Sequence, residues 1–570
     1  MRTRWHTLWL AAFSAVMLHP APALAQRTLD LGGPPGDSLR RCYSDSQLTA
    51  ALNAINGLAA VRDFGGRDIV PAGGTVSSSY YVYDGSLRVD GTVTGDVLVL
   101  NGSLRVTAHG AVLGQITVIG GTVLVDPGAN VPRSPFACAD PAPLTQQDGV
   151  VTIRPAVREL ASYTSGIAFV TNGIRFTPHV ALGQYNRVEA LPVHLGINAV
   201  AGLTSADTVH FAGYGVLRTG RDPSGSRPAI GWHTALQVSH AGSIPFIVGV
   251  EGGSTIDPTA DRPFTSTESG LSAFALRRDY SDWFLRRGAS VFASVRPTSE
   301  LTLDASLDRS RQTTVLATDA FSILRVTEPW RPNPLIDDGT YQTLSLGATF
   351  DGRDARRHPV IGWYAHGDVH FVRSGSLTPV SLPTSIRDAV PTSNYAESDG
   401  NFDLRGFLRL DPVQRINARI EGGGYLGGDP LTIQRRRALG GSDPLPGYDF
   451  RELNCDRRRV ADPATPALCD RYMAIQLEYR HVIPFEVSTR IAGRTIGIRR
   501  PDFVVMADAG TAWLAGDSAG RVPANRIQTL AEWKSDVGVG VSSGPVGFYI
   551  AKSLVDPLPV RFILLLSPRF

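Results

Sequence analysis

The stretch "VRFILLLSPRF", residues 560–570, alternates apolar side chains with a second, mixed set of side chains. The mixed set includes Arg561, Ser567 and Arg569. Because successive side chains of a β-strand point to opposite faces, the pattern predicts a strand with one face toward an apolar surrounding. That wholly apolar face comprises Val560, Phe562, Leu564, Leu566, Pro568 and Phe570.

The same alternation fills the chain from residue 166 onward. Turn and loop residues separate strand-like stretches of about 9–11 positions, the length of strands that cross a membrane with a lipid face and a lumen face. The sequence therefore predicts an all-β protein whose residues 166–570 form an antiparallel transmembrane β-barrel, with a soluble sandwich as the alternative. Clear examples are "ASVFASVRP" (289–297), "LTLDASLDR" (301–309), "TLSLGATFD" (343–351) and "RINARIEGGGYL" (415–426).

The N-terminus has the features of an export signal. Arg2 and Arg4 precede an apolar run over residues 8–18, and small residues follow at Ala23 and Ala25. This order predicts a signal peptide over residues 1–25, cleaved before Gln26. The run is too short to span a membrane as a helix, and no later stretch offers about 18 uninterrupted apolar residues. An exported protein of this kind is either soluble or a membrane barrel.

The charge balance and the cysteines indicate which partners and which bonds to expect. The 55 Lys+Arg residues nearly balance 52 Asp+Glu residues, which argues against a nucleic-acid partner. Four cysteines in an oxidising compartment predict disulfides, although three connectivities exist. We favour Cys42–Cys138 and Cys455–Cys469, since each pair brackets one region; free thiols are the alternative.

A short internal repeat precedes the barrel region. Gly85, Gly102 and Gly121 lie 17 and 19 residues apart, with β-branched runs between them. Such spacing predicts stacked coils of a β-solenoid within residues 26–145, followed by a linker over residues 146–165. Residues 45–60 have helical apolar spacing and are expected to cap the solenoid. The module resembles the small β-helical repeats of bactofilin-type proteins, and a structural role is expected for it.

Five stretches in the second half of the chain resemble, in order, motifs of the bacterial surface antigen family. This family is the barrel shared by BamA, TamA and the two-partner secretion transporters. In "FDGRDARRHPVIGWY" (350–364), Asp351, Arg353, Asp354, Pro359 and Gly362 match its Asp-x-Arg-Asp…Pro…Gly strand. The others are "ALGGSDPLPGYDF" (438–450), "AIQLEYRHVIP" (474–484), "FVVMADAGTAW" (503–513) and "KSDVGVGVSSGPVGFYIAKSL" (534–554). Residues 185–196 look like an early strand of related barrels.

The resemblance implies a barrel of sixteen strands in the outer membrane. An even count places both ends of the barrel, and with them the solenoid, in the periplasm. A strand ending on an aromatic residue resembles the C-terminal signal of outer-membrane barrels, carried here by Phe562 and Phe570. The periplasmic client-capturing domains of the family are not matched by residues 26–150.

The resemblance also implies that one external loop folds into the lumen. In the family, an arginine at the tip of this loop contacts an aspartate of the Phe…Asp-x-Gly strand, which here is Asp508. Pro446 occupies the arginine position and has neither charge nor donor. We hypothesise that Arg451 reaches Asp508 instead; loss of the contact is the alternative. The loop motif comprises Gly440, Gly441, Leu445, Pro446, Gly447 and Tyr448.

Three patterns suggest catalytic or metal chemistry but lack the context that it needs. "GDSAG" (516–520) matches a nucleophile elbow around Ser518 but lies between two strands, and "GDSL" (36–39) lies in a Pro/Gly-rich leader. His366 and His370 share a strand face without a third ligand. Neither a cofactor nor a metal is predicted, and the protein is not expected to be an enzyme.

The sequence thus predicts a barrel for assembly, insertion or translocation of protein or lipid at the outer membrane. Outer-membrane lipid is the expected surrounding, and a periplasmic or envelope protein is the expected partner of the solenoid. One alternative is a structural barrel that anchors the solenoid to such a partner. A second alternative is an outer-membrane esterase or phospholipase acting through Ser518.

Overall fold

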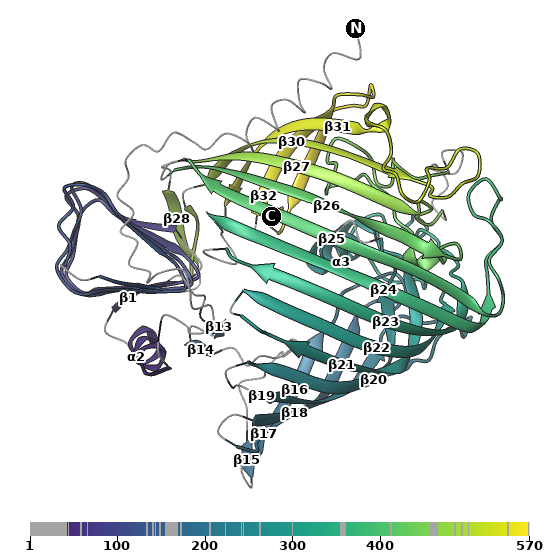
Figure 1. Ribbon diagram of the computed structural model, residues 1–570, viewed down its shortest axis with the longest axis horizontal. Helices are drawn as coiled ribbons and strands as arrows, with labels where there is room; N and C mark the ends of the chain where they lie inside the picture. Colours follow the sequence, from purple (N-terminus) through teal and green to yellow (C-terminus); the bar gives the residue numbers. More distant parts are fainter. Residues whose placement is uncertain are drawn as a thin grey trace. The chain divides into compact units, whose positions relative to one another are not determined.

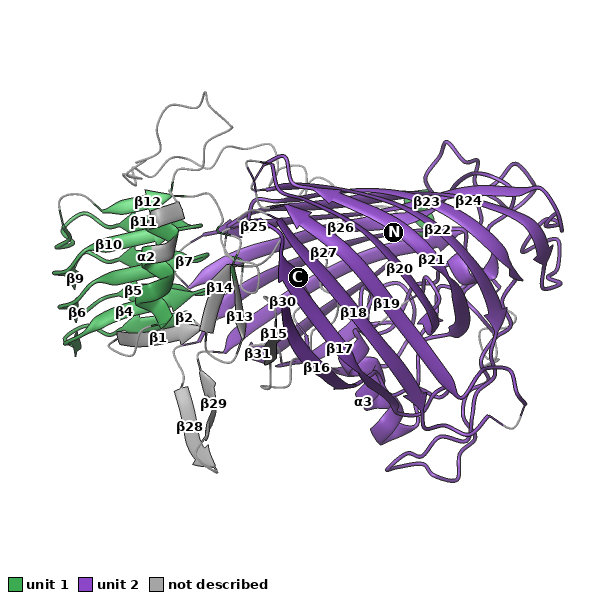
Figure 2. Cartoon of the chain, turned by 90° about the horizontal axis from the view of Figure 1, so that it is seen from below, with its two compact units in different colours: residues 1–153, 354–360, 529–533 green, residues 154–353, 361–528, 534–570 purple. Residues whose placement is uncertain are grey.

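The computed structural model divides the chain into two compact units: residues 1–153 with two short later segments, and the remainder (Figure 2). The predicted signal peptide, the 36–39 motif, Cys42 and Asp354 lie outside the described residues. The structure describes residues 43–570 except 44, 57–59, 65–66, 133–134, 139–141, 143, 148–149, 154–168, 172–173, 205–206, 223, 241, 243, 262–263, 299, 354–358, 360, 411–412, 457–464, 484–485, 492–493, 500, 544–545 and 568.

The first unit is a β-solenoid built from three parallel sheets, which confirms the predicted fold. The coils repeat at the predicted spacing: Ser86 pairs with Ser103, and Ser103 pairs with Thr122. The stack also extends beyond the visible sequence repeat at both ends. The sheets are β1 (Ala60–Phe64), β4 (Ser79–Tyr83), β7 (Val97–Leu100), β10 (Ile116–Ile119) and β12 (Phe136–Cys138); β2 (Arg67–Val70), β5 (Ser86–Val89), β8 (Ser103–Val106) and β11 (Thr122–Val125); and β3 (Thr75–Val76), β6 (Thr92–Val93) and β9 (Ala111–Val112).

The repeated turns explain the Asp-Gly and Asn-Gly pairs. Asp84 and Asn101 have φ of 52° and 50°, a left-handed conformation that Asp and Asn tolerate better than most residues. The glycine that follows stacks on the coil below. A Cβ on Gly102 would lie 2.1 Å from the carbonyl oxygen of Gly85, so no other residue fits there.

A helix covers one face of the solenoid. In β7, Val97 and Val99 enter the core between the sheets, whereas Leu98 and Leu100 face outward and pack with helix α2 (Asp45–Asn56). Both faces of β7 are therefore buried, which explains why all four of its residues are apolar. The helix packs on side chains from four strands of its sheet, so it covers a face rather than the end of the stack. A hairpin of β13 (Leu144–Gln147) and β14 (Val150–Ile153) follows.

The second unit is an antiparallel sheet curled into a barrel (Figure 1). Sixteen strands and a three-residue strand, β15, make up this sheet, so the predicted barrel is confirmed with one short addition. The strands are β15 (Phe169–Thr171), β16 (Ile174–Leu182), β17 (Pro192–Gly202), β18 (Asp207–Arg218), β19 (Ile230–His240), β20 (Phe246–Pro258), β21 (Trp283–Val295), β22 (Leu301–Thr314), β23 (Asp338–Asp351), β24 (Gly362–Thr378), β25 (Tyr395–Arg409), β26 (Gln414–Gly428), β27 (Arg471–Val482), β30 (Asp502–Trp513), β31 (Lys534–Ser543), β32 (Val546–Ser553) and β33 (Arg561–Leu565).

The outer face of this sheet carries a continuous apolar row. Side chains that lie opposite one another in successive ladders are all exposed, as expected for a surface that meets lipid. The helices among the described residues are all too short or too polar to cross a membrane. The row runs through Leu236, Val250, Val291, Leu307, Leu344 and Phe371.

Long loops join the strands at one end of the barrel and mostly short turns join them at the other. The long connections include 259–282 with helix α3 (Ser266–Leu276), 315–337, 429–470 and 514–533. At the opposite end, the connection from β27 to β30 carries an extra hairpin of β28 (Glu486–Ile491) and β29 (Arg494–Arg499). The loop 429–470, called the lumen loop below, contains the whole predicted loop motif, residues 438–450.

Candidate functional site: the lumen loop and the wall that it contacts

The tip of the lumen loop is buried against the inner wall of the barrel. Leu445 and Tyr448 are both 0% exposed. The backbone N–H of Gly447 donates to Asp536 Oδ2 of β31 at 2.8 Å, and Ser553 of β32 donates to the Tyr448 hydroxyl at 2.8 Å. Burial raises the pKa of Tyr448 to about 12. The tip therefore contacts the last strands of the sheet through a backbone amide, which needs no arginine.

Glycines let the loop fold this tightly. Gly440 and Gly441 have φ of 109° and 120°, which residues with a side chain rarely adopt. A Cβ on Gly447 would lie 2.5 Å from the Cβ of Asp536, so the tip could not approach the wall with a larger residue. Pro446 is compatible with this contact because the donated N–H belongs to the next residue.

Arg451 does not contact Asp508, so the predicted pair is wrong. Its Nε donates to Asp261 at 2.7 Å, and its Nη2 lies 2.8 Å from Asp282. Arg451 has a left-handed backbone, with φ of 57°, and its amide lies 3.4 Å from the Gly440 carbonyl. This turn directs the side chain toward the loop 259–282 instead of the wall at Asp508.

Three arginines surround Asp282. Burial alone would raise the pKa of this carboxyl, but the charges of Arg331, Arg451 and Arg187 outweigh burial and lower the pKa. The cluster ties the lumen loop to three other loops at the same end of the barrel, 183–191, 259–282 and 315–337. Charge-assisted hydrogen bonds of this kind fix geometry as well as adding stability.

Asp508 instead receives an arginine from the segment after the last strand. Arg569 Nη2 donates to Asp508 Oδ2 at 2.8 Å, and Nη1 donates to Glu478 of β27 at 3.2 Å. The Arg569 side chain is 1% exposed. Asp508, the wall aspartate that the resemblance implied, thus has an arginine partner. That arginine comes from residues 566–570, called the tail below, and not from the lumen loop.

The tail corrects the prediction of a strand over residues 560–570. β33 ends at Leu565, and Phe570 is buried, so Phe570 does not extend the exposed apolar face of β33 that carries Phe562. The Leu566 N–H donates to Glu268 of α3 at 2.7 Å instead of to a strand. Buried carboxylates attract Arg569 inward, and alternation alone could not reveal them.

The Asp-x-Arg strand motif holds the turn after β23. Arg353 donates to Asp351 at 2.7 Å and lies 4.8 Å from the ring centroid of Tyr364. Gly362 has φ of 119°, and a Cβ there would lie 2.3 Å from the Gly352 carbonyl oxygen. Pro359 is buried. These contacts give the motif residues a structural role in the turn.

The predicted bridge between Cys455 and Cys469 is confirmed, with a Cα–Cα distance of 5.0 Å. It closes a short ring in the lumen loop beside the contact of Arg437 with Cys469. Cys138 is buried in the core beneath α2, and the Cys42 half of the other predicted bond lies outside the described residues.

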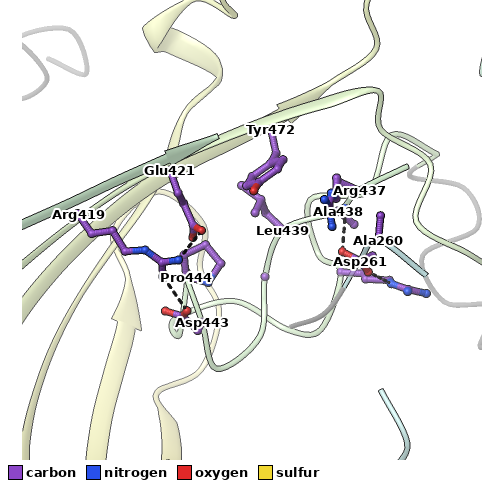
Figure 3. Close-up of a pocket in the computed structure, with 12 residues that line it drawn as sticks. Ala260, Asp261, Arg419, Glu421, Arg437, Ala438, Leu439, Asp443, Pro444 and Tyr472 are labelled. Atoms are coloured by element: carbon purple, nitrogen blue, oxygen red, sulfur yellow. Dashed lines mark hydrogen bonds and ion pairs between the residues drawn. The ribbon is translucent and has the colours of Figure 1, made fainter. Parts of the chain in front are cut away.

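A cavity of about 410 Å³ lies between the lumen loop and the wall (Figure 3). Arg419 of β26 donates to Glu421 at 2.8 Å and lies 3.4 Å from Asp443. Gln476 of β27 donates to Asp443 at 2.7 Å. The positive and negative side chains that line the cavity are equal in number, so the cavity has no surplus charge to attract a charged ligand. The contacts instead hold the lumen loop in place. The charged lining residues are Arg419, Arg437, Arg451, Asp261, Glu421 and Asp443.

The catalytic and metal patterns find little support in the geometry. Ser518 lies in an exposed turn, closed by a hydrogen bond from the Arg521 amide to the Ser518 carbonyl, and not at a strand-to-helix elbow. His366 and His370 lie 3.2 Å and 3.4 Å from Asp368, which sits between them. No metal-binding group of His, Cys, Asp or Glu occurs in the part of the chain that the structure describes.

Sequence reasoning missed the main partners of the site: Arg569, Glu478, Asp536, Asp261 and Asp282. The only signal was the position of Arg569 on the mixed face of an otherwise apolar stretch. Asp261, Asp282 and Asp536 are separated from the lumen loop by many residues along the chain. Arg451 and Asp261, for example, lie 190 residues apart.

Several solved structures are similar to this chain. No family model matches the chain, and no curated protein does. The chain is similar to BamA from Haemophilus ducreyi lacking POTRA domains 1–3, at 12% identity and a TM-score of 0.40, over 69% of this chain and 70% of that chain. It is similar to CdiB from Acinetobacter baumannii, at 10% identity and a TM-score of 0.29, over 69% of this chain and 59% of that chain. It is also similar to CdiB from Escherichia coli, at 12% identity and a TM-score of 0.30, over 74% of this chain and 67% of that chain.

Proposed function

We propose that the protein is an outer-membrane barrel that assists assembly, insertion or translocation of protein or lipid. The observation that carries the proposal is the lumen loop pinned to the last strands of the sheet, at Asp536 and Ser553. Together with Arg569 at Asp508, it holds this part of the wall from inside. Contacts of this kind can rearrange without loss of the barrel, because they are separate from its strand ladders.

The proposed mechanism needs no catalytic residue. The first and last strands of the barrel would pair weakly, and the seam between them would open toward lipid while the lumen loop stabilises the wall. The N-terminal solenoid would lie in the periplasm, because sixteen strands leave both ends of the barrel on one side of the membrane. There it would bind a periplasmic or envelope protein.

The contacts inside the lumen also suit a second candidate function. A loop and a tail that both occupy the lumen would suit a closed barrel whose task is to anchor the solenoid. In that case the barrel would have no client, and its interior contacts would serve stability alone. An esterase acting through Ser518 has no comparable observation in its favour.

Depletion of the protein in cells separates the two candidates. An assembly factor should lower the amounts of other folded outer-membrane barrels, measured by heat-modifiable migration on gels. A change in outer-leaflet lipid with normal barrels would favour lipid as the client. Unchanged barrels and lipid would overturn the proposal in favour of the anchor. Restoration by the wild-type chain, but not by a chain with Gly447→Ala, would connect the effect to the lumen loop.

The partner of the solenoid calls for a separate experiment. Full-length protein and a chain lacking residues 43–153 would be purified from crosslinked envelopes and compared. A periplasmic protein recovered only with the full-length chain would support binding by the solenoid. Equal recovery with both chains would assign that partner to the barrel.

A further inference from the structure

Helix α3 contacts the segments that adjoin both ends of the barrel sheet. On one side, a Cβ on Gly270 would lie 3.4 Å from the Tyr185 amide, just beyond β16, and the Tyr185 ring packs edge-on against Phe274 at 5.2 Å. On the other side, Leu566 and Ser567, just beyond β33, donate to Glu268 Oε1 at 2.7 Å and 3.0 Å. Figure 2 shows the helix near the ends of β16 and β17. The helix therefore links the segment that follows β16 to the tail that follows β33.

One carboxylate fixes both the helix and the tail. Glu268 Oε2 accepts from the Thr265 amide at 3.1 Å and from its hydroxyl at 2.7 Å, which completes a capping box at the start of α3. Glu268 Oε1 accepts from the tail. Because Glu268 is buried, both sets of contacts are shielded from water. The orientation of α3 at this position is therefore well defined.

The helix faces outward with apolar side chains, and a second segment enlarges this surface. The Ile323 and Leu324 amides donate to the carbonyls of Phe274 and Ala275, both at 3.0 Å, and thereby join loop 315–337 to the end of α3. The resulting surface, called the α3 patch, is made of Leu271 (48% exposed), Phe274 (38%), Phe321 (64%), Ile323 (55%), Leu324 (53%) and Val326 (58%).

The two segments that α3 contacts each follow a strand with exposed apolar side chains. Val180 and Leu182 at the end of β16 are 59% and 62% exposed, and Phe562 and Leu564 on β33 are 82% and 52% exposed. An apolar surface of this extent is unfavourable in water and marks a contact with lipid or protein. Continuity with the outer face of the barrel favours lipid over the other partners.

We propose that the α3 patch contacts the acyl chains of the membrane and continues the lipid-facing surface of the barrel between β16 and β33. The proposal requires that the barrel sits in a membrane, but it does not require a client. Depletion experiments can therefore fail to support assembly while this contact is confirmed, and the reverse is equally measurable.

Spin labelling of full-length protein in phosphatidylethanolamine–phosphatidylglycerol vesicles tests the proposal. Leu271→Cys would carry a nitroxide, attached without reductant so that disulfide-bonded cysteines do not react. Collisions with oxygen, which concentrates in acyl chains, would be compared with collisions with a water-soluble nickel chelate. We expect a label at position 271 to favour oxygen several-fold over the chelate, relative to a label in water.

Two leucines of similar exposure provide matched controls. Leu564→Cys on β33 (52% exposed) should report lipid, and Leu113→Cys in the solenoid (58% exposed) should report water. Phe321→Cys tests the second segment of the α3 patch if a label at position 271 prevents folding, which heat-modifiable migration would show. Labels at positions 271 and 321 that behave like the label at position 113 would overturn the proposal. Protection from both collision partners would also overturn it, because that result would indicate protein contact.

Discussion

Arg451 is the charged partner of the buried carboxylate of Asp261. We predict that Arg451→Met destabilises the barrel by about 3–5 kcal/mol, because it leaves that charge buried without a cation. Denaturant unfolding in lipid vesicles, followed by tryptophan fluorescence, would measure the loss.

The control for this variant is an arginine whose ion pair is exposed. Arg325 pairs with Glu328 at 3.2 Å, and their side chains are 41% and 53% exposed. Arg325→Met should change stability by less than about 1 kcal/mol, since water screens such pairs. Equal losses in the two variants would show that burial does not govern the Arg451 contact.

The contact between Arg569 and Asp508 can be isolated with a double-mutant cycle. Arg569→Ala, Asp508→Asn and the double variant should show a coupling of about 0.5–3 kcal/mol, because each single change removes the same contact. Single-channel conductance should also rise in Arg569→Ala, since the tail loses its hold in the lumen. Arg561→Ala on β33 is the control, because this arginine pairs with Asp449 nearer the surface. Additive effects would place the role of Arg569 elsewhere.

At the residue scale, the sequence predicted the loss of the loop-tip arginine but not the residue that pairs with Asp508 in its place. Pro446 correctly showed that the loop tip has no arginine. The substitute could not be predicted, because it depends on the left-handed backbone at Arg451 and on the end of β33 at Leu565. Both features follow from contacts between residues far apart in the chain.

At the element scale, the lumen loop depends on one glycine. Gly447→Ala would place a methyl group 2.5 Å from the Cβ of Asp536, so the tip must withdraw from the wall. We expect a loss of about 1–3 kcal/mol, typical of overpacking, and faster proteolysis of the loop. Gly375→Ala in β24 is the matched control, because a Cβ there meets nothing within 4 Å. Unchanged proteolysis in Gly447→Ala would mean that the tip is not held at Asp536.

Strands with a strong period-two pattern were predictable from sequence, and elements that break the pattern were not. Residues 289–295 of the first predicted stretch lie in β21, and residues 301–309 lie in β22, because each strand has one lipid face and one lumen face. The position of α3 escaped prediction, since a helix inside a loop depends on the tail that Glu268 binds. The hairpin of β28 and β29 was likewise not predicted.

At the scale of the whole molecule, the outer apolar row should determine stability in the membrane. Val250 lies in that row on β20 and is 49% exposed. Val250→Arg should cost about 2–4 kcal/mol in lipid vesicles if it sits near the bilayer midplane. Leu113→Arg in the solenoid should stay within about 0.5 kcal/mol, as exposed substitutions usually do. Equal effects would argue against a lipid-facing row.

The stacked coils of the solenoid have a geometric consequence for the protein's reach. Neighbouring strands lie about 4.8 Å apart, and each coil touches only the coils beside it. Gain or loss of one coil, 17 or 19 residues here, would change the length of the module by about that distance. The number of coils therefore sets the length of the solenoid in fixed steps, and this length can change without any change in the strands of the barrel.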